Sequence, residues 1–413
     1  MNKKIHYSWF MFIGCCIMQF TIVGAVINGA GLFYTPICDE LGFGRGELAL
    51  YNTISSTMMA LAAPFWGKVM NKLPIKPLLA GCLITDSVAL LALSRATQLW
   101  HWYVAGFFMG IANSVLCMLI TPVILNNWFQ KNLGLVTGIA MSFSGIGGAV
   151  INPVNAAIIE KFGWRTAQTV VALMPVVLVL PFVLMFYYMR PEDKGIKAFG
   201  AEESVLSSKK NALSGMTMQQ ALKSVLFPLV IVYAALGSFG AGFPNFLSSI
   251  AVSLGKTMSY GATLASMAMI GNIAGKLVLG WINDKFGIKM ASASATIFLL
   301  VCHVCLFAGV QGNVSLLLSA GAFLSGTAMS LSSVMIPLIS KYVFGEKEYS
   351  SIYSYISMGS SLAIAAASSI IGFTYDIFGT YAISSIIALV IYTICLLSVF
   401  VIFKMKDKES AAQ

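Results

Sequence analysis

Twelve long apolar runs, joined by short polar segments, are the feature of this sequence that most constrains its fold. Each run has about 20 residues or more, the length that an α-helix needs to cross the hydrocarbon core of a bilayer. Hydrophobic residues make up 58% of the 413 residues and charged residues only 10%, whereas roughly 25% of a soluble domain is charged. The sequence therefore predicts an all-α membrane protein with twelve transmembrane helices and the lipid bilayer as a partner.

Basic residues are distributed unevenly between the two sets of loops. Of the 25 Lys and Arg residues, one lies inside an apolar run and 19 lie at the tails and at one set of loops. The other five lie at the opposite loops: Arg45, Arg95, Lys161, Arg165 and Lys256. Positive charge gathers on the cytoplasmic side, so we expect a multi-pass protein of the cell (inner) membrane with both termini cytoplasmic. This orientation also explains the net charge of +10, and no nucleic-acid partner is expected.

A short pattern recurs four times along the chain, each time after the second run of a group of three. It has a small residue, an acid or Asn four positions later, and a glycine or proline three positions after that. The four copies begin at Gly67, Ala156, Gly280 and Gly372. They predict two six-helix halves, each of two inverted three-helix repeats, at residues 1–189 and 224–404. Residues 190–223 then form a cytoplasmic linker and 405–413 a cytoplasmic tail. Such repeats place a solute site between the halves near the bilayer midplane, which favours a secondary transporter and not an enzyme.

Lys276 is the one Lys or Arg that lies inside an apolar run. It precedes Asp284 by eight residues, so its backbone lies about 12 Å from that end of the helix. A charge at this depth costs about 3 kcal/mol or more, and it commonly marks a substrate pathway. Asn272, Lys276 and Gly280 share one helix face because they are four residues apart. We therefore expect Lys276 to bind an anion. The alternative is a lysine paired with Asp86 or with backbone carbonyls, or neutralised by burial.

Asp86 is the one acid inside an apolar run, midway between Lys76 and Arg95. As a buried carboxyl group it could carry a proton across the membrane. The structural alternative is an acid that is hydrogen-bonded to a neighbouring helix through Ser or Thr.

A Cys-x-x-Cys pair, Cys302 and Cys305, brackets His303 in the ninth run. A metal site needs about four well-placed ligands, and no second cluster of this kind occurs. We interpret His303 as a packed or hydrogen-bonded residue and the eight cysteines as packing residues, and we expect neither a metal nor a cofactor.

The loop around the third copy of the repeat resembles the signature of the major facilitator superfamily, and the resemblance covers essentially the whole chain. The matching positions are Gly280, Asp284, Lys285, Gly287 and Lys289. In the first half the corresponding segment has Gly67, Asn71 and Lys72, with Asn71 in place of the acid and Pro74 in place of the glycine. The resemblance implies the twelve-helix fold and a conformational role for these loops, with a weakened signature at Asn71.

A narrower resemblance rests on Trp128-Phe-Gln-Lys-Asn-Leu-Gly-Leu-Val-Thr-Gly138-Ile-Ala140 and on Ser144-Gly-Ile-Gly147-Gly148. This string is similar to the monocarboxylate transporters and the oxalate/formate antiporters. The resemblance implies a substrate-binding cation at Lys276. It also places Asn272 where monocarboxylate transporters often have a proton-carrying acid, and Ser360 where the antiporter has a second lysine. One cation suits one carboxylate, so the resemblance favours monocarboxylates.

Other polar residues are candidates for the same cavity. Asn28 aligns with a substrate-facing aromatic residue of the antiporter, although a hydrogen bond between helices is an equal alternative. Tyr233 in run 7 and Ser357 in run 11 are secondary candidates with Ser360.

Together these features predict a transporter of small organic anions that works by alternating access as a monomer. Protons and a counter-anion both stay open as coupling partners. The alternatives are an exporter of neutral or drug-like solutes and, more remotely, a transporter-like membrane sensor.

Overall fold

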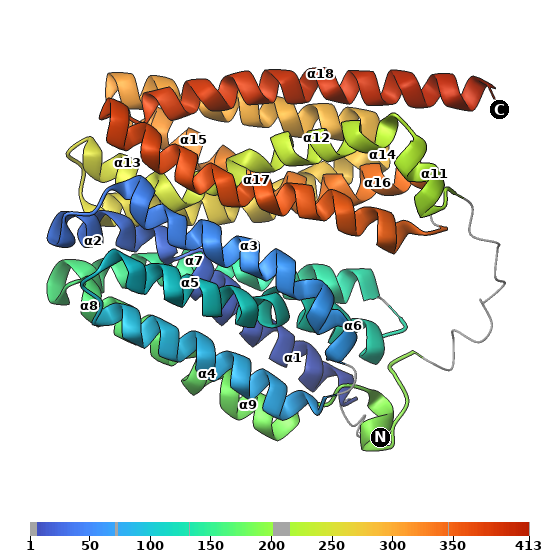
Figure 1. Ribbon diagram of the computed structural model, residues 1–413, viewed down its shortest axis with the longest axis horizontal. Helices are drawn as coiled ribbons and strands as arrows, with labels where there is room; N and C mark the ends of the chain where they lie inside the picture. The colour runs from blue at the N-terminus through green and yellow to red at the C-terminus, as the bar shows by residue number, and fades with distance from the viewer. Residues whose placement is uncertain (1–5, 71–72, 132, 201–214, 346, 413) are drawn as a thin grey trace. The chain divides into compact units, whose positions relative to one another are not determined.

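The computed structural model describes residues 6–412 except 71–72, 132, 201–214 and 346. This part of the chain is almost entirely helical (Figure 1). Ten of its helices are long and apolar enough to cross a membrane. One of these ten, α14 (Met258–Gly312), has 55 residues, which at 1.5 Å per residue is more than twice the thickness of the hydrocarbon core. The protein is therefore a multi-pass membrane protein.

Gly287 explains the length of α14. Its backbone has φ 82° and ψ 167°, which is not helical and which favours glycine. The helix therefore turns at Gly287, and α14 contains two spans, matching the runs Met258 to Ile282 and Ile288 to Val310. A further helix, α3 (Arg45–Val69), matches the run Glu47 to Met70 but is not among the ten. With α14 taken as two spans and α3 included, the described helices account for the predicted twelve.

The chain divides into two compact units. Unit 1 comprises 1–43 and 54–209, and unit 2 comprises 44–53 and 210–413, so α3 begins in unit 2 and continues in unit 1. The predicted boundaries at 189 and 223 stay a prediction. Unit 1 contains α1 (Ser8–Met18), η1 (Gln19–Ile27), η2 (Ala30–Phe33), α2 (Tyr34–Leu41), α4 (Ile75–Ser94), α5 (Leu99–Asn113), η3 (Ser114–Leu119), α6 (Ile120–Trp128), α7 (Leu133–Phe162), α8 (Trp164–Met174), η4 (Pro175–Val179), α9 (Leu180–Phe186) and η5 (Pro191–Lys194). Unit 2 contains α11 (Met218–Lys223), α12 (Leu226–Ser238), η6 (Phe239–Phe246), α13 (Leu247–Ser253), α14, α15 (Ser315–Ser330), η7 (Leu331–Met335), α16 (Ile336–Phe344), α17 (Tyr349–Phe378) and α18 (Ala382–Ala412).

Several spans are interrupted by π-helical turns, and prolines explain three of them. A proline has no N–H, and its ring clashes with the carbonyl group four residues earlier. Pro122, Pro181 and Pro337 each place that carbonyl inside a π-helical segment: η3, η4 and η7 respectively. The wider turn accommodates the proline ring without ending the span. The first span of each unit is also interrupted, by η1 and η2 in unit 1 and by η6, which contains Pro244, in unit 2.

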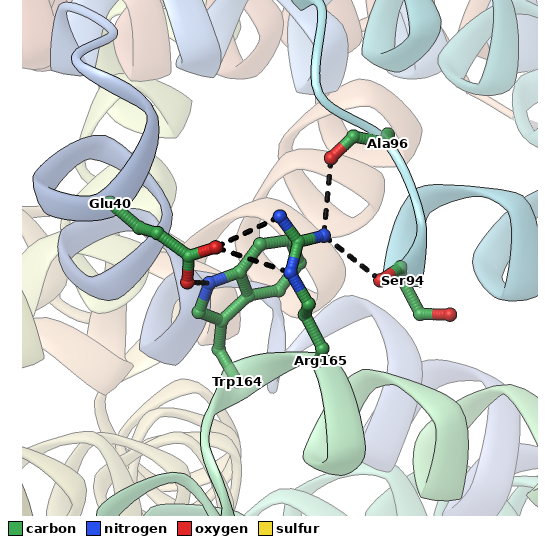
Figure 2. A network of polar contacts seen from close by, with 5 residues as sticks. All are labelled: Glu40, Ser94, Ala96, Trp164 and Arg165. Atoms are coloured by element: carbon green, nitrogen blue, oxygen red, sulfur yellow. Dashed lines mark hydrogen bonds and ion pairs between the residues drawn. The ribbon is translucent and has the colours of Figure 1, made fainter.

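A polar network fixes one set of helix ends in unit 1 (Figure 2). One carboxylate oxygen of Glu40 accepts from Arg165 Nη2 at 2.9 Å and Nε at 3.2 Å, and the other accepts from Trp164 Nε1 at 2.6 Å. Arg165 Nη1 also donates to the carbonyl groups of Ser94 and Ala96 at 3.1 and 3.2 Å. The network therefore joins the ends of α2 and α4 to the start of α8.

Candidate solute-binding site

Lys276 lies in the first span of α14 and is half-buried. Its neighbours Gly275 and Leu279 are buried, whereas Leu277 and Val278 are 71% and 42% exposed. Lys276 therefore lies at the border between the packed and the open face of the helix. Among the residues that the structure describes, none forms a hydrogen bond or ion pair with its ammonium group. Its role in binding an anion stays a prediction.

Asn272, one turn before Lys276, is held at the contact between α14 and α15. Ser330 Oγ donates to the Asn272 backbone carbonyl at 2.8 Å and is 3.3 Å from the side-chain oxygen. Gly326 allows this close approach, because a Cβ atom there would clash with the backbone of Asn272. Asn272 is only 4% exposed. The contact fixes the turn of α14 that carries Lys276.

The other candidates in unit 2 lie on different helices. Ser357 is half-buried on α17, and Ser360 is 7% exposed and donates to the carbonyl of Ile356 at 3.3 Å. Tyr233 lies on α12, which packs against α17. Its side chain is fully buried, and its hydroxyl group has no partner among the described residues. No hydrogen bond in the described part of the chain joins these three residues to Lys276, so their role in binding stays a prediction.

Asn28 in unit 1 connects two helices. Its side-chain amide donates to the carbonyl of Ser144 on α7 at 3.2 Å. Gly24 and Gly147 bring η1 and α7 together there, since a Cβ atom on Gly24 would lie 2.7 Å from Gly147 Cα. This is the structural alternative that we gave for Asn28, and its place in a substrate site stays a prediction.

Asp86 is fully enclosed in unit 1. One of its carboxylate oxygens accepts from Asn113 Nδ2 on α5 at 3.0 Å, and the other is buried without a partner among the described residues. The bond joins α4 to α5, as the structural alternative requires, but the partner is an amide and not the Ser or Thr that we expected. A proton-carrying role for Asp86 stays a prediction.

His303 is packed between aromatic rings. Its ring centroid lies 4.3 Å from that of Phe243 and 5.4 Å from that of Tyr392, and it is 1% exposed. Within the described residues, no group of three or more His, Cys, Asp and Glu side chains could hold a metal ion. All eight cysteines are free thiols.

The residues of the loop signature are mostly at the surface. Asp284 is exposed and accepts from the side chain of Asn283 at 3.3 Å, while the Lys285 ammonium lies 5.1 Å from the Trp281 ring. Lys289 is exposed two residues after the turn at Gly287. In the first-half copy, Gly67 lies in α3, and Asn71 and Lys72 lie outside the described residues. The conformational role of both loops stays a prediction.

Sequence analysis missed one polar cluster in unit 2, at the start of α3. The carboxylate of Asp376 accepts from the backbone N–H groups of Arg45 and Gly46 at 3.0 and 2.7 Å, which satisfies donors at a helix N-terminus. Arg45 is buried and donates to the Tyr381 hydroxyl at 2.8 Å, with its guanidinium 4.0 Å from the Tyr375 ring. Arg45 and Gly46 are at least 330 positions away from these partners in the sequence, and only the recurring acid at Asp376 signalled the contact.

One large hollow, of about 770 Å³, lies on unit 1 between α4 and α5. Exposed apolar side chains such as Val88 and Val104 line it. Neither Asp86 nor Asn28 belongs to its lining, so this hollow is separate from the candidate substrate residues.

Interrupted spans, and a half-buried cation inside one of them that has no partner among the described residues, are typical of membrane transport proteins. A family comparison agrees: the model of the Major Facilitator Superfamily matches residues 15–268 and 229–413. The chain belongs to the Major Facilitator Superfamily, and it is a transporter.

Relatives in sequence carry a transporter name at low identity. Monocarboxylate transporter 12 of Mus musculus is 24% identical over 325 residues, which is 73% of this chain and 66% of that protein. The human protein of the same name is matched over 62% of its length, so the chain spans less than two thirds of these two relatives. Monocarboxylate transporter 12-B of Danio rerio is 24% identical over 403 residues, 91% of this chain and 82% of that protein.

Solved structures share the fold. The nucleoside transporter NupG superimposes with a TM-score of 0.71 at 13% identity, covering 97% of this chain and 99% of that one. A bacterial homolog of the human lysosomal transporter Spinster gives a TM-score of 0.73 at 12% identity, covering 98% of both chains. The predicted fold is confirmed, and the likeness to these structures extends to the fold alone.

Proposed function

We propose that this protein is a secondary transporter of small organic anions, above all monocarboxylates, and that it works by alternating access. The observation that carries the proposal is Lys276, a half-buried cation inside a span without a partner among the described residues. Such a charge is stabilised by an anion that enters and leaves with the transport cycle. The relatives named monocarboxylate transporters support a carboxylate as this anion.

In this proposal the Lys276 ammonium binds the substrate carboxylate, and Asn28, Asn272 and Ser360 offer hydrogen bonds. Ser357 and Tyr233 are secondary candidates for the same cavity. The protein lies in the cell (inner) membrane with both termini in the cytoplasm and works as a monomer. Coupling is to protons or to a counter-anion, and the assay below separates the two.

The test is counterflow of labelled formate, acetate, lactate, pyruvate, oxalate and larger aromatic acids into proteoliposomes. Wild type is compared with Lys276→Gln, and Lys256→Gln is the matched control because Lys256 lies outside the spans. We expect counterflow of at least one monocarboxylate in wild type and control, and at least about ten-fold less in Lys276→Gln. A pH gradient that drives uptake would identify proton coupling, and a trans anion that is required would identify exchange. Normal counterflow by Lys276→Gln would overturn the proposal. The same holds if folded wild-type protein shows no counterflow of any of these acids.

A further inference from the structure

A second group of cations, which does not include Lys276, lines a hollow of about 500 Å³ in unit 2. We call it the basic hollow, and its lining consists of Lys289, Phe400, Lys404, Asp407 and Lys408. The last four lie on one face of α18 because they are spaced by four, three and one residues. Lys289 comes from α14, which packs against α18. Two helices therefore build the hollow together.

The charges of the basic hollow are not balanced within the protein. Lys289, Lys404 and Lys408 are exposed, and among the described residues none of them forms an ion pair with Asp407 or with another acid. Three cations and one acid leave a formal excess of two positive charges. Lys404 and Lys408 repel each other across one helical turn. An anion with two negative charges would relieve this repulsion.

The position of the basic hollow along the helices indicates which anion it binds. In α18 the apolar residues give way to charged residues from Lys404 onward, and Lys289 lies two residues after the turn at Gly287 that separates the two spans of α14. Phe400, one turn before Lys404, is 50% exposed on the apolar side. Because apolar residues occupy the hydrocarbon core, we expect the lysines at the level of the lipid headgroups and Phe400 at the level of the acyl chains. The sequence predicts this end to be cytoplasmic.

We propose that the basic hollow binds the headgroup of an anionic phospholipid, and that it prefers a headgroup with two phosphates. Basic pockets between transmembrane helices bind such headgroups. The three lysines contact the phosphates, and Phe400 contacts the start of an acyl chain. Asp407 opposes binding through its like charge and so limits the affinity. The proposal is independent of the solute that the protein transports.

The test starts from delipidated protein in detergent, to which cardiolipin, phosphatidylglycerol or phosphatidylcholine is added. Native mass spectrometry then measures how much of each lipid stays bound to the protein. The variants are the triple substitution Lys289→Gln, Lys404→Gln, Lys408→Gln, its Arg counterpart, and Asp407→Asn. A control triple, Lys161→Gln, Lys223→Gln, Lys256→Gln, changes the net charge equally outside the hollow. Glycerol phosphate serves as a soluble competitor without acyl chains.

In wild type and in the control triple we expect cardiolipin to bind more tightly than phosphatidylglycerol, and both more tightly than phosphatidylcholine. One lysine near a headgroup changes binding about five-fold, so the Gln triple loses cardiolipin by on the order of 100-fold. The Arg triple retains cardiolipin, and Asp407→Asn binds it several-fold more tightly.

Three results would overturn the proposal. These are undiminished cardiolipin binding in the Gln triple, an equal loss in the control triple, and competition by glycerol phosphate as strong as that by the lipid. The last result would assign the hollow to a free phosphate compound. If the Gln triple does not fold, the single lysine variants and Asp407→Asn decide, since their effects must have opposite signs.

Discussion

Asp86 in unit 1 and Lys276 in unit 2 are both ionisable groups inside spans, and the protein surrounds them differently. Asp86 is fully buried, and a carboxylate oxygen is bonded to Asn113 on the adjacent helix. Lys276 is half-buried at the border of a packed helix face and has no partner among the described residues. An enclosed, bonded group stabilises the contact between two helices, whereas an open, unpaired group can meet a solute. The comparison predicts a structural role for Asp86 and a binding role for Lys276.

The largest expected effect is on transport by Lys276→Gln. A hydrogen bond to a charged group contributes about 1.5–3 kcal/mol, so losing the cation should lower counterflow by at least about ten-fold. Thermal unfolding should stay the same or move to higher temperature, because an unpaired charge has left the span. Lys276→Arg keeps the charge and should keep part of the activity. A large fall in the unfolding temperature of Lys276→Gln would instead show that the lysine stabilises the helix packing.

Asn113→Leu should act on stability and not on transport. It leaves the buried carboxyl of Asp86 without its donor, which costs about 1–3 kcal/mol. Unfolding in detergent should therefore occur at lower temperature, while counterflow per folded molecule stays near wild type. The double variant Asp86→Leu, Asn113→Leu removes both polar partners and should recover much of the loss. Unchanged stability of Asn113→Leu, or lost counterflow in a folded Asp86→Asn protein, would contradict a purely structural role for Asp86.

The fold can be predicted from local patterns in the sequence. The apolar runs have spanning length, Gly287 supplies the turn inside α14, and prolines mark three of the π-helical turns. The depth of Lys276 could likewise be counted from Asp284.

The partners of the buried groups could not be predicted. Whether Asp86 meets Asn113 or a hydroxyl depends on the rotation of α5 against α4, which no local pattern fixes. The same holds for Asp376 and Arg45, which are 331 residues apart. Helix rotation and register are decided by packing, such as the glycine contact of Gly326 with α14.

Asn272→Asp tests whether Lys276 must be unpaired to bind a substrate, because it places an acid one helical turn before the lysine. The two positions are four apart on one helix, so the carboxylate introduced by the substitution can pair with the ammonium group. At neutral pH we expect counterflow several-fold below wild type, because the pair competes with the substrate carboxylate. Lowering the pH protonates the new acid and frees the cation, so activity should rise as pH falls. Asn272→Ser is the control without an acid, and its pH profile should follow wild type. A profile for Asn272→Asp that also follows wild type would show that the two side chains do not interact.

The smallest effect is expected for Ser360→Ala. The Ser360 hydroxyl already donates to the Ile356 carbonyl of its own helix, so only its remaining acceptor capacity is available to a substrate. A neutral hydrogen bond contributes about 1 kcal/mol at most here, and counterflow should fall by less than about five-fold. The effect should appear as a raised KM, because a neutral contact made equally in all states changes binding and not turnover. Measuring KM for the best monocarboxylate in Ser360→Ala and in Ser357→Ala tests this. A loss as deep as that of Lys276→Gln would mean that the hydroxyl and the cation hold the same carboxylate, and that binding does not rest on the cation alone.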